Sequence, residues 1–271
     1  MELFGNPSDA LAWTACFAGA GILLDTIERL ADRAELSDGG MFAWTWLRGS
    51  AVVRRRSLLA RRAMAIVFDV PGVFGLLWLR LCGAFVVLTW PGVSAISTIG
   101  LAAIFATGSL LNVRDAPTGG ATATRVLTMI SGVLLLTRLA PASGVVAAAA
   151  LWFIALQAAL SYVTAGVGKL RHRGWRSGSR LAELFAMASV GAPQDLARFL
   201  RAHPTVSGTL ARAIVAAECT LPIVILGVPH AAPYVLAAGV GFHLVNAAVL
   251  GLNTYFWAWL TMYPALGYVA P

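Results

Sequence analysis

Charged residues are scarce in this chain, and lysine is almost absent. Asp, Glu, Lys and Arg make up 12% of the 271 residues, hydrophobic residues make up 59%, and the mean hydropathy is +0.78. Soluble domains carry about 25% charged residues, so this composition excludes a soluble globular protein. It predicts an all-α, polytopic integral membrane helical bundle.

The signatures of several common chemistries are also missing. The sequence contains no dinucleotide-binding glycine fingerprint, no P-loop and no nucleophile elbow. Cys16, Cys82 and Cys219 lie in apolar runs, so we interpret them as packing residues, and no His or Cys pair has the spacing of metal ligands. The net charge of +8 comes from basic residues between hydrophobic runs, which favours cytoplasmic retention of loops over binding of nucleic acid.

The apolar runs predict about eight transmembrane helices in a single domain, 1–271. The predicted spans are 11–30, 66–90, 93–111, 124–140, 144–169, 211–228, 232–250 and 254–269. Glu2 and Asp9 precede the first run, so we expect a span there rather than a cleavable signal. Proline and glycine predict a turn-rich connection at 112–120, and an amphipathic piece at 194–201 is expected on the membrane surface. The basic loops 48–62 and 171–180 are expected on the cytoplasmic side of the cell membrane, with both termini outside.

Charged residues lie within both of the first two predicted spans. Asp25 and Arg29 are four residues apart, which predicts an intrahelical ion pair, interpreted here as lying at headgroup level. Arg80 lies well inside the second span. It either extends to the interface or faces a polar interior, and the sequence does not decide between these.

The one lysine ends the apolar run that begins near residue 145. The other 19 basic residues are arginines, so Lys169 indicates a position where guanidinium does not serve. An amine can lose its proton and a guanidinium cannot. Tyr162, Ala165 and Gly166 share the helix face of Lys169. The alternative is a lysine that reaches the interface beside the basic loop, and spacing does not settle the choice.

Glu218 is the only acidic residue after Asp195, and it lies about eight residues inside an apolar helix. An ionisable group at that depth indicates function or a paired partner. Pro222 follows four residues later and cannot donate to the carbonyl of residue 218. The structural alternative is a pair with Arg80 or Arg212.

His243 and Asn246 are three residues apart and share one face of the seventh span. A packing histidine is the alternative. We therefore predict a polar pocket between spans five, six and seven, lined by Tyr162, Lys169, Glu218, His243 and Asn246.

Two blocks of residues, within about 150–266, resemble a known family. The first block comprises Gln157, Tyr162, Ala165, Gly166, Lys169 and Leu170, followed by Trp175 and Gly178; the second comprises Phe242, His243, Asn246, Leu252, Phe256, Tyr263 and Pro264. Their order and spacing resemble the signature of the HTTM superfamily, the membrane part of vitamin K-dependent γ-carboxylase and its bacterial relatives. Glu218 falls where that family has an acid, whereas the first half is similar only in its hydropathy pattern.

The resemblance implies that Lys169 is a base that deprotonates a reduced menaquinone or vitamin K-type hydroquinone, with O2 and CO2 as further reactants. It also implies roles for Glu218 and His243 in proton transfer, and a pocket that includes Gln157, Tyr162, Gly166, Trp175 and Asn246. The chain departs from the carboxylase branch because it lacks a histidine near 112–120 and a large extramembrane region. Its length is similar to compact bacterial members that resemble sporulation-delaying-protein B, which take part in maturing a secreted peptide.

Three functions are therefore weighed on the sequence. The first is a membrane enzyme that uses a quinol and Lys169 to modify a small peptide or metabolite, in contact with membrane lipids. The second is a non-catalytic membrane partner for maturation, export or immunity of a secreted peptide. The third is a small-molecule transporter, which the lack of an internal repeat or matched broken helices disfavours.

Overall fold

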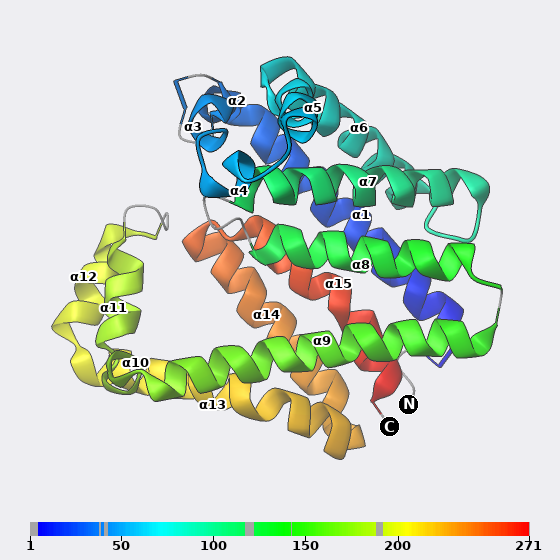
Figure 1. Cartoon of the computed structure of the whole chain (residues 1–271). Coiled ribbons are helices and arrows are strands. Elements are labelled where there is room, and N and C mark those ends of the chain that lie inside the picture. Colours follow the sequence, from blue (N-terminus) through cyan, green and yellow to red (C-terminus); the bar gives the residue numbers. More distant parts are fainter. Residues whose placement is uncertain are drawn as a thin grey trace. The chain divides into compact units, whose positions relative to one another are not determined.

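The computed structural model describes residues 5–37, 39–40, 43–116, 122–141, 143–187 and 192–270. It is 87% helical and has no strand among these residues, which confirms the all-α prediction. The long helices are α1 (Pro7–Ala31), α6 (Val70–Thr89), α7 (Ala95–Asp115), α8 (Thr122–Leu139), α9 (Gly144–Arg171), α13 (Pro204–Gly227), α14 (Ala232–Leu250) and α15 (Asn253–Val269) (Figure 1).

Shorter helices connect the long ones. They are α2 (Arg33–Leu36), α3 (Trp44–Leu47), α4 (Ala51–Arg54), α5 (Leu58–Phe68), α10 (Arg173–Ser177), α11 (Ser179–Ala186), α12 (Gln194–Ala202) and the 3₁₀ turn η2 (Pro229–Ala231). The two basic segments expected as loops are thus partly helical. The amphipathic piece predicted at 194–201 forms α12, whose buried side chains are Ala197 and Leu200.

Seven of the described helices are long and apolar enough to cross a membrane, so the chain is a multi-pass membrane protein. They are α1, α6, α7, α8, α9, α13 and α14, and they correspond to the first seven predicted spans. The segment predicted as the eighth is α15, which has 17 residues, ten of them buried. Its length lies at the lower limit for a spanning helix, so an eighth span stays a prediction.

Local sequence explains where several helices begin. The Asp69 side chain accepts a hydrogen bond from the Val70 amide at 3.0 Å, and Pro71 lies in the first turn of α6, which separates α5 from α6. Ser94 caps α7 in the same way through the Ser97 amide at 3.1 Å. The predicted interruption near Asp69 is therefore confirmed.

The end of α7 differs from the prediction. The turn-rich connection expected at 112–120 is wrong for 112–115, because α7 continues to Asp115. Arg114 and Asp115 are both buried. Asp115 pairs with Arg29, as described below, and its Oδ1 lies 3.7 Å from Arg114 Nη1. Residues 117–120 lie outside the described residues.

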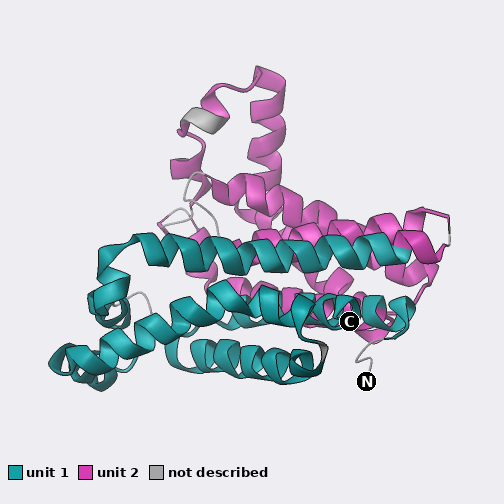
Figure 2. Cartoon of the chain, turned by 90° about the horizontal axis from the view of Figure 1, so that it is seen from below, with its two compact units in different colours: residues 1–11, 147–271 teal, residues 12–146 magenta. Residues whose placement is uncertain are grey.

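The chain divides into two compact units (Figure 2). Residues 12–146 form one unit, which contains α2 to α8 and most of α1. Within it, α6 and α7 approach closely because Gly83 and Gly100 face each other: a Cβ on either would lie 3.0 Å from the carbonyl oxygen of the other. Small residues at such contacts let transmembrane helices pack backbone against backbone.

The other unit contains residues 1–11 and 147–271, and hence the start of α1, almost all of α9, and α10 to α15. Gly178 separates α10 from α11 with a φ of 84°, a left-handed conformation that glycine adopts without strain. Its carbonyl oxygen accepts a hydrogen bond from the Ser207 hydroxyl at 2.7 Å. This bond holds the segment after α9 against the first turn of α13.

Candidate functional site

The only lysine and the one acid of α13 form an ion pair. Lys169, in the last turn of α9, donates a hydrogen bond from Nζ to Oε1 of Glu218. The two helices come close because Gly166 faces α13: a Cβ there would lie 2.7 Å from Cys219 Sγ and 3.2 Å from Glu218 Cβ. Gly166 thus brings the two charges within bonding reach.

The pair is asymmetric in its surroundings. The Lys169 side chain is 23% exposed and its Nζ lies 5.2 Å from the centre of the Trp175 ring, a cation–π distance. The Glu218 side chain is 9% exposed, and its second oxygen, Oε2, is buried without a hydrogen-bond partner among the described residues. An unpaired buried oxygen costs about 1–3 kcal/mol or more, so this atom is poised to accept a hydrogen bond.

Both arginines that were considered as structural partners of Glu218 make other contacts. Arg212 donates instead to the Thr209 hydroxyl at 3.4 Å, and Arg80 is bonded to Asp25. The cation recorded in contact with Glu218 is Lys169.

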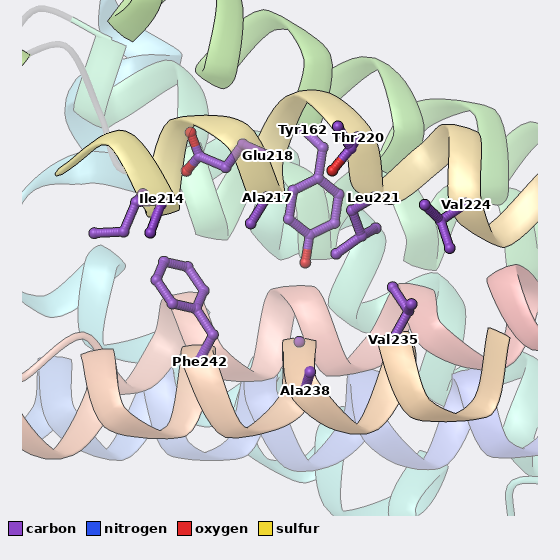
Figure 3. A pocket seen from close by; sticks show the side chains of 12 residues that line it. Tyr162, Ile214, Ala217, Glu218, Thr220, Leu221, Val224, Val235, Ala238 and Phe242 are labelled. Atoms are coloured by element: carbon purple, nitrogen blue, oxygen red, sulfur yellow. The ribbon is translucent and has the colours of Figure 1, made fainter. Parts of the chain in front are cut away.

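A cavity of about 400 Å³ lies between α13 and α14, closed on one side by Tyr162 of α9 (Figure 3). Most of its lining is apolar; the lining residues are Tyr162, Ala213, Ile214, Ala217, Glu218, Thr220, Leu221, Val224, Val235, Ala238, Gly239 and Phe242. The Tyr162 hydroxyl points into the space between the two helices (Figure 3). An apolar cavity of this size with a few polar groups is typical of a small-molecule site.

Tyr162 also belongs to a buried hydrogen-bonded chain. Its hydroxyl lies 2.8 Å from His243 Nε2 and 2.8 Å from the Tyr263 hydroxyl. Two directions of this chain satisfy both contacts: Tyr263 to Tyr162 to Nε2, with the ring hydrogen of neutral His243 on Nδ1, and Nε2 to Tyr162 to Tyr263, with that hydrogen on Nε2. That Nδ1 is buried and has no partner among the described residues.

Aromatic packing fixes this chain in place. The His243 ring stacks on Trp259 with centroids 4.8 Å apart and an interplanar angle of 12°. Trp259 also lies 4.0 Å from the Tyr162 ring, centroid to centroid. Gly239 makes room for Tyr263, because a Cβ there would lie 2.2 Å from the Tyr263 hydroxyl. The hydroxyl and imidazole groups are therefore held rigidly.

The predicted site residues fall into two groups. Lys169, Glu218, Gly166 and Trp175 come together at the ion pair, and Tyr162 and His243 come together in the hydrogen-bonded chain. Of the five residues expected to line one pocket, Tyr162 and Glu218 line the cavity, whereas Lys169, His243 and Asn246 are not among its lining residues.

Two other predicted residues lie apart from the cavity. Gln157 is half-buried on α9, and its Nε2 is 3.4 Å from the Ser161 hydroxyl of the next turn. Asn246 is half-buried on α14 and lies almost one turn after His243. Neither is brought to the ion pair by a contact that the structure records.

Sequence reasoning missed Trp259 and the role of Tyr263. A signal was present, since Tyr255, Trp259 and Tyr263 recur at intervals of four and share one face of α15. That aromatic face meets His243.

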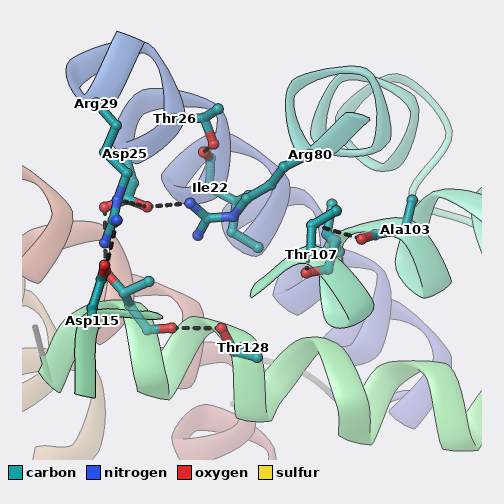
Figure 4. Close-up of polar contacts among 11 residues, drawn as sticks. Ile22, Asp25, Thr26, Arg29, Arg80, Ala103, Thr107, Asp115 and Thr128 are labelled. Carbon is teal, nitrogen blue, oxygen red and sulfur yellow. Dashed lines mark hydrogen bonds and ion pairs between the residues drawn. The ribbon is translucent and has the colours of Figure 1, made fainter. Parts of the chain in front are cut away.

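A second buried charge cluster lies in the unit of residues 12–146 (Figure 4). Asp25 accepts a hydrogen bond from Arg80 Nη1, its Oδ2 lies 3.4 Å from Arg29 Nε, and its Oδ1 accepts from the Thr124 hydroxyl at 3.3 Å. Arg29 Nη1 also donates to Asp115 Oδ2 at 2.7 Å. We name Asp25, Arg29, Arg80, Arg114 and Asp115 the arginine–aspartate cluster.

This cluster resolves two alternatives from the sequence. The intrahelical pair of Asp25 and Arg29 is confirmed, but Asp25 is buried and joined to other helices rather than forming an isolated pair. Arg80 is 1% exposed, so it faces the interior of its unit and does not extend to an interface. Asp115 enters the cluster from the stretch that was expected to be a loop.

No group of three or more His, Cys, Asp and Glu side chains in the described ranges is placed to hold a metal ion. Comparison with known proteins returned no matching family model, no matching characterised protein and no matching solved structure. What the site can do is therefore argued from its geometry. It offers a carboxylate that lines an apolar cavity and is paired with a lysine outside the lining, together with a phenol of the adjacent hydrogen-bonded chain that lines the same cavity.

Proposed function

We propose that this chain is a membrane enzyme that binds a lipid-soluble quinol in the cavity between α13 and α14 and removes a hydroxyl proton from it with the Lys169–Glu218 pair. One observation carries the proposal. The buried Oε2 of Glu218 has no partner within the described residues and belongs to a side chain on the cavity wall, while Oε1 is bonded to the only lysine of the chain.

The fit of a quinol to this site rests on the residues present. An aromatic ring with an isoprenoid tail is apolar, as is most of the lining, and each ring hydroxyl needs an acceptor. Oε2 of Glu218 supplies an acceptor, and the Tyr162 hydroxyl is a second polar group on the wall. When bound, the quinol would supply reducing power and an acidic hydroxyl.

The proton would move through Glu218 rather than directly to the lysine. Lys169 does not line the cavity, whereas Glu218 does. In the proposed resting form the pair is an amine and a carboxylic acid. The acid passes its own proton to Nζ and takes one from the quinol at Oε2. The pair then consists of an ammonium beside a neutral acid, and this positive charge offsets the negative charge left in the cavity.

Lys169 would then be the group that an arginine cannot replace. A guanidinium retains its proton, so Lys169→Arg keeps the charge and removes the amine form. His243 and Tyr162 would orient the ring or relay protons. The modified acceptor would be a small peptide or metabolite, with O2 or CO2 as further reactants.

The test is oxygen consumption by the purified protein in detergent with reduced menaquinone. We expect uptake by the wild type and at least a 100-fold loss in Lys169→Arg and in Glu218→Gln, because general acid–base groups contribute about 10²–10⁴-fold. Uptake by the arginine variant at the wild-type rate would contradict the proposal. No uptake by any variant would favour a non-catalytic partner for a secreted peptide.

A second pair of variants tests the cavity itself. Ala217 lines the cavity, so Ala217→Trp should fill it and weaken quinol binding at least tenfold. Ile223 lies on the same helix, is 69% exposed and does not line the cavity. Ile223→Trp should leave binding unchanged, measured by quenching of protein fluorescence with a short-chain quinol. Equal effects of the two tryptophans would show that the quinol binds elsewhere.

A further inference from the structure

A second cleft, of about 310 Å³, opens on the face of α13 that meets α9 and α10. Its lining residues are Leu170, Trp175, Arg176, Arg212, Val215, Ala216 and Cys219. None of them lines the cavity proposed for the quinol. The cleft is therefore a separate site within the same unit.

The cleft has a cationic end and an apolar end. Val215, Ala216 and Cys219 lie three, four and seven residues after Arg212, so the four residues form one stripe along α13. The stripe is about 10 Å long, because seven residues separate its ends at 1.5 Å each. Arg212 lies at one end of the stripe, and the remaining side chains are apolar or, at Cys219, a thiol.

The cationic end lies near the C-terminal end of α9. Ser207, near the start of α13, bonds to Gly178, which follows α10. Gly166, one turn before the end of α9, packs against Cys219. The stripe on α13 thus runs from the connecting segment towards the interior of the spanning part, and Arg212 lies at its outer end.

Arg176 adds a second positive charge from α10. Arg176 and Arg212 are exposed and, within the described ranges, neither makes an ion pair with a carboxylate. No acidic residue lines the cleft. Trp175, beside them, has the residue type that is enriched at membrane interfaces. The positive charge of Arg176 and Arg212 fits an anionic headgroup, and the apolar stripe fits a hydrocarbon chain joined to it.

We propose that this cleft binds one anionic phospholipid, with its phosphate at Arg176 and Arg212 and an acyl chain along Val215, Ala216 and Cys219. Basic pockets between transmembrane helices are suited to anionic headgroups, and the apolar stripe distinguishes a lipid from free phosphate. The site also borders the ion pair, since Cys219 follows Glu218 and Trp175 contacts Lys169. A bound lipid would cover this side of the pair.

The test measures binding of phosphatidylglycerol and phosphatidylcholine to the purified full chain in detergent by native mass spectrometry. The wild type should retain phosphatidylglycerol in preference to phosphatidylcholine. Arg176→Gln/Arg212→Gln should bind phosphatidylglycerol about 25-fold more weakly, roughly fivefold for each arginine. Arg171→Gln/Arg173→Gln removes the same charge from neighbouring exposed positions outside the cleft and should weaken binding less than threefold.

The apolar end has its own pair of variants. Ala216→Trp should block the acyl chain and weaken phosphatidylglycerol binding at least tenfold, whereas Ile223→Trp should not. Equal losses in the two double-arginine variants would overturn the proposal in favour of diffuse attraction. Unchanged lipid binding by Ala216→Trp, or full competition by inorganic phosphate at equal concentration, would overturn it in favour of a free-phosphate site. Lipid binding and quinol-dependent oxygen uptake are separate measurements, so a negative result in one does not contradict the proposal that the other tests.

Discussion

The protein holds two buried ionic groups that differ in how completely their carboxylate oxygens are paired. In the arginine–aspartate cluster, Asp25 contacts two arginines and the Thr124 hydroxyl, and Arg29 bridges both aspartates. In the other group, one lysine meets one glutamate, and the second glutamate oxygen is left without a partner among the described residues. The first arrangement uses its carboxylates to hold helices together, whereas the second leaves an unpaired oxygen on a side chain that lines a cavity.

The residue types follow the same division. Every cation of the cluster is arginine, which keeps its proton in proteins and forms several hydrogen bonds at fixed angles. The cation of the pair is lysine, which can exchange its proton. The comparison distinguishes a carboxylate whose oxygens are all paired from one that pairs with an exchangeable cation and keeps a second oxygen without a recorded partner.

The largest effect is expected when the cluster loses a carboxylate. Asp25→Asn leaves Arg80, which is 1% exposed, without its counter-ion, and breaking a buried pair costs about 3–5 kcal/mol. Thermal and denaturant unfolding in detergent should show this loss. The double variant Asp25→Asn/Arg80→Leu removes the stranded charge and should recover part of the stability. If Asp25→Asn alone were as stable as the wild type, the structural role of the arginine–aspartate cluster would be contradicted.

A smaller effect is expected when α9 and α13 are forced apart. Gly166→Ala places a methyl group 2.7 Å from Cys219 Sγ, and overpacking of this kind costs about 2 kcal/mol. It should also weaken the ion pair and lower quinol-dependent activity. Gly168→Ala is the matched control on the same helix, since a Cβ there meets nothing within 4 Å. Equal stability of the two variants would contradict the close contact of the helices.

The smallest effect is expected when the pair loses its carboxylate charge. Glu218→Gln should cost only about 1 kcal/mol, because the Lys169 side chain is 23% exposed and keeps its contact with Trp175. The loss should exceed that of Asp195→Asn, whose pair with Arg198 is almost fully exposed and is worth less than about 0.5 kcal/mol. A cost as large as that of Asp25→Asn would mean that the pair is structural.

Much of the fold could be read from hydropathy. The first seven predicted spans correspond to helices, because a run of about 20 apolar residues satisfies its backbone hydrogen bonds only within itself in lipid. The end of α7 was misjudged because composition near Pro117 and Gly119 favours a turn. Contacts between Arg29 and Asp115 hold the last turn of α7, and such long-range contacts leave no local signal.

The candidate site was found in part. Lys169 and Glu218 drew attention because each is rare in its surroundings, but their pairing was not foreseen. The two residues are 49 positions apart. The cation that pairs with Glu218 depends on which helix faces it and at which height along the helix. From the sequence, Arg80 and Arg212 were also possible partners.

The sequence alone determined that this is a multi-pass helical membrane protein, since the length and hydrophobicity of each run are local properties that the bilayer reads directly. It also determined that only one of the 20 lysine and arginine side chains can lose its proton, because lysine occurs once. Only the tertiary structure decided that Lys169 pairs with Glu218, that Glu218 and Tyr162 line the same cavity, and that Arg80 is buried and paired with Asp25. These outcomes depend on the packing of helices far apart in the chain, where close contacts at glycines such as Gly166 set which side chains meet.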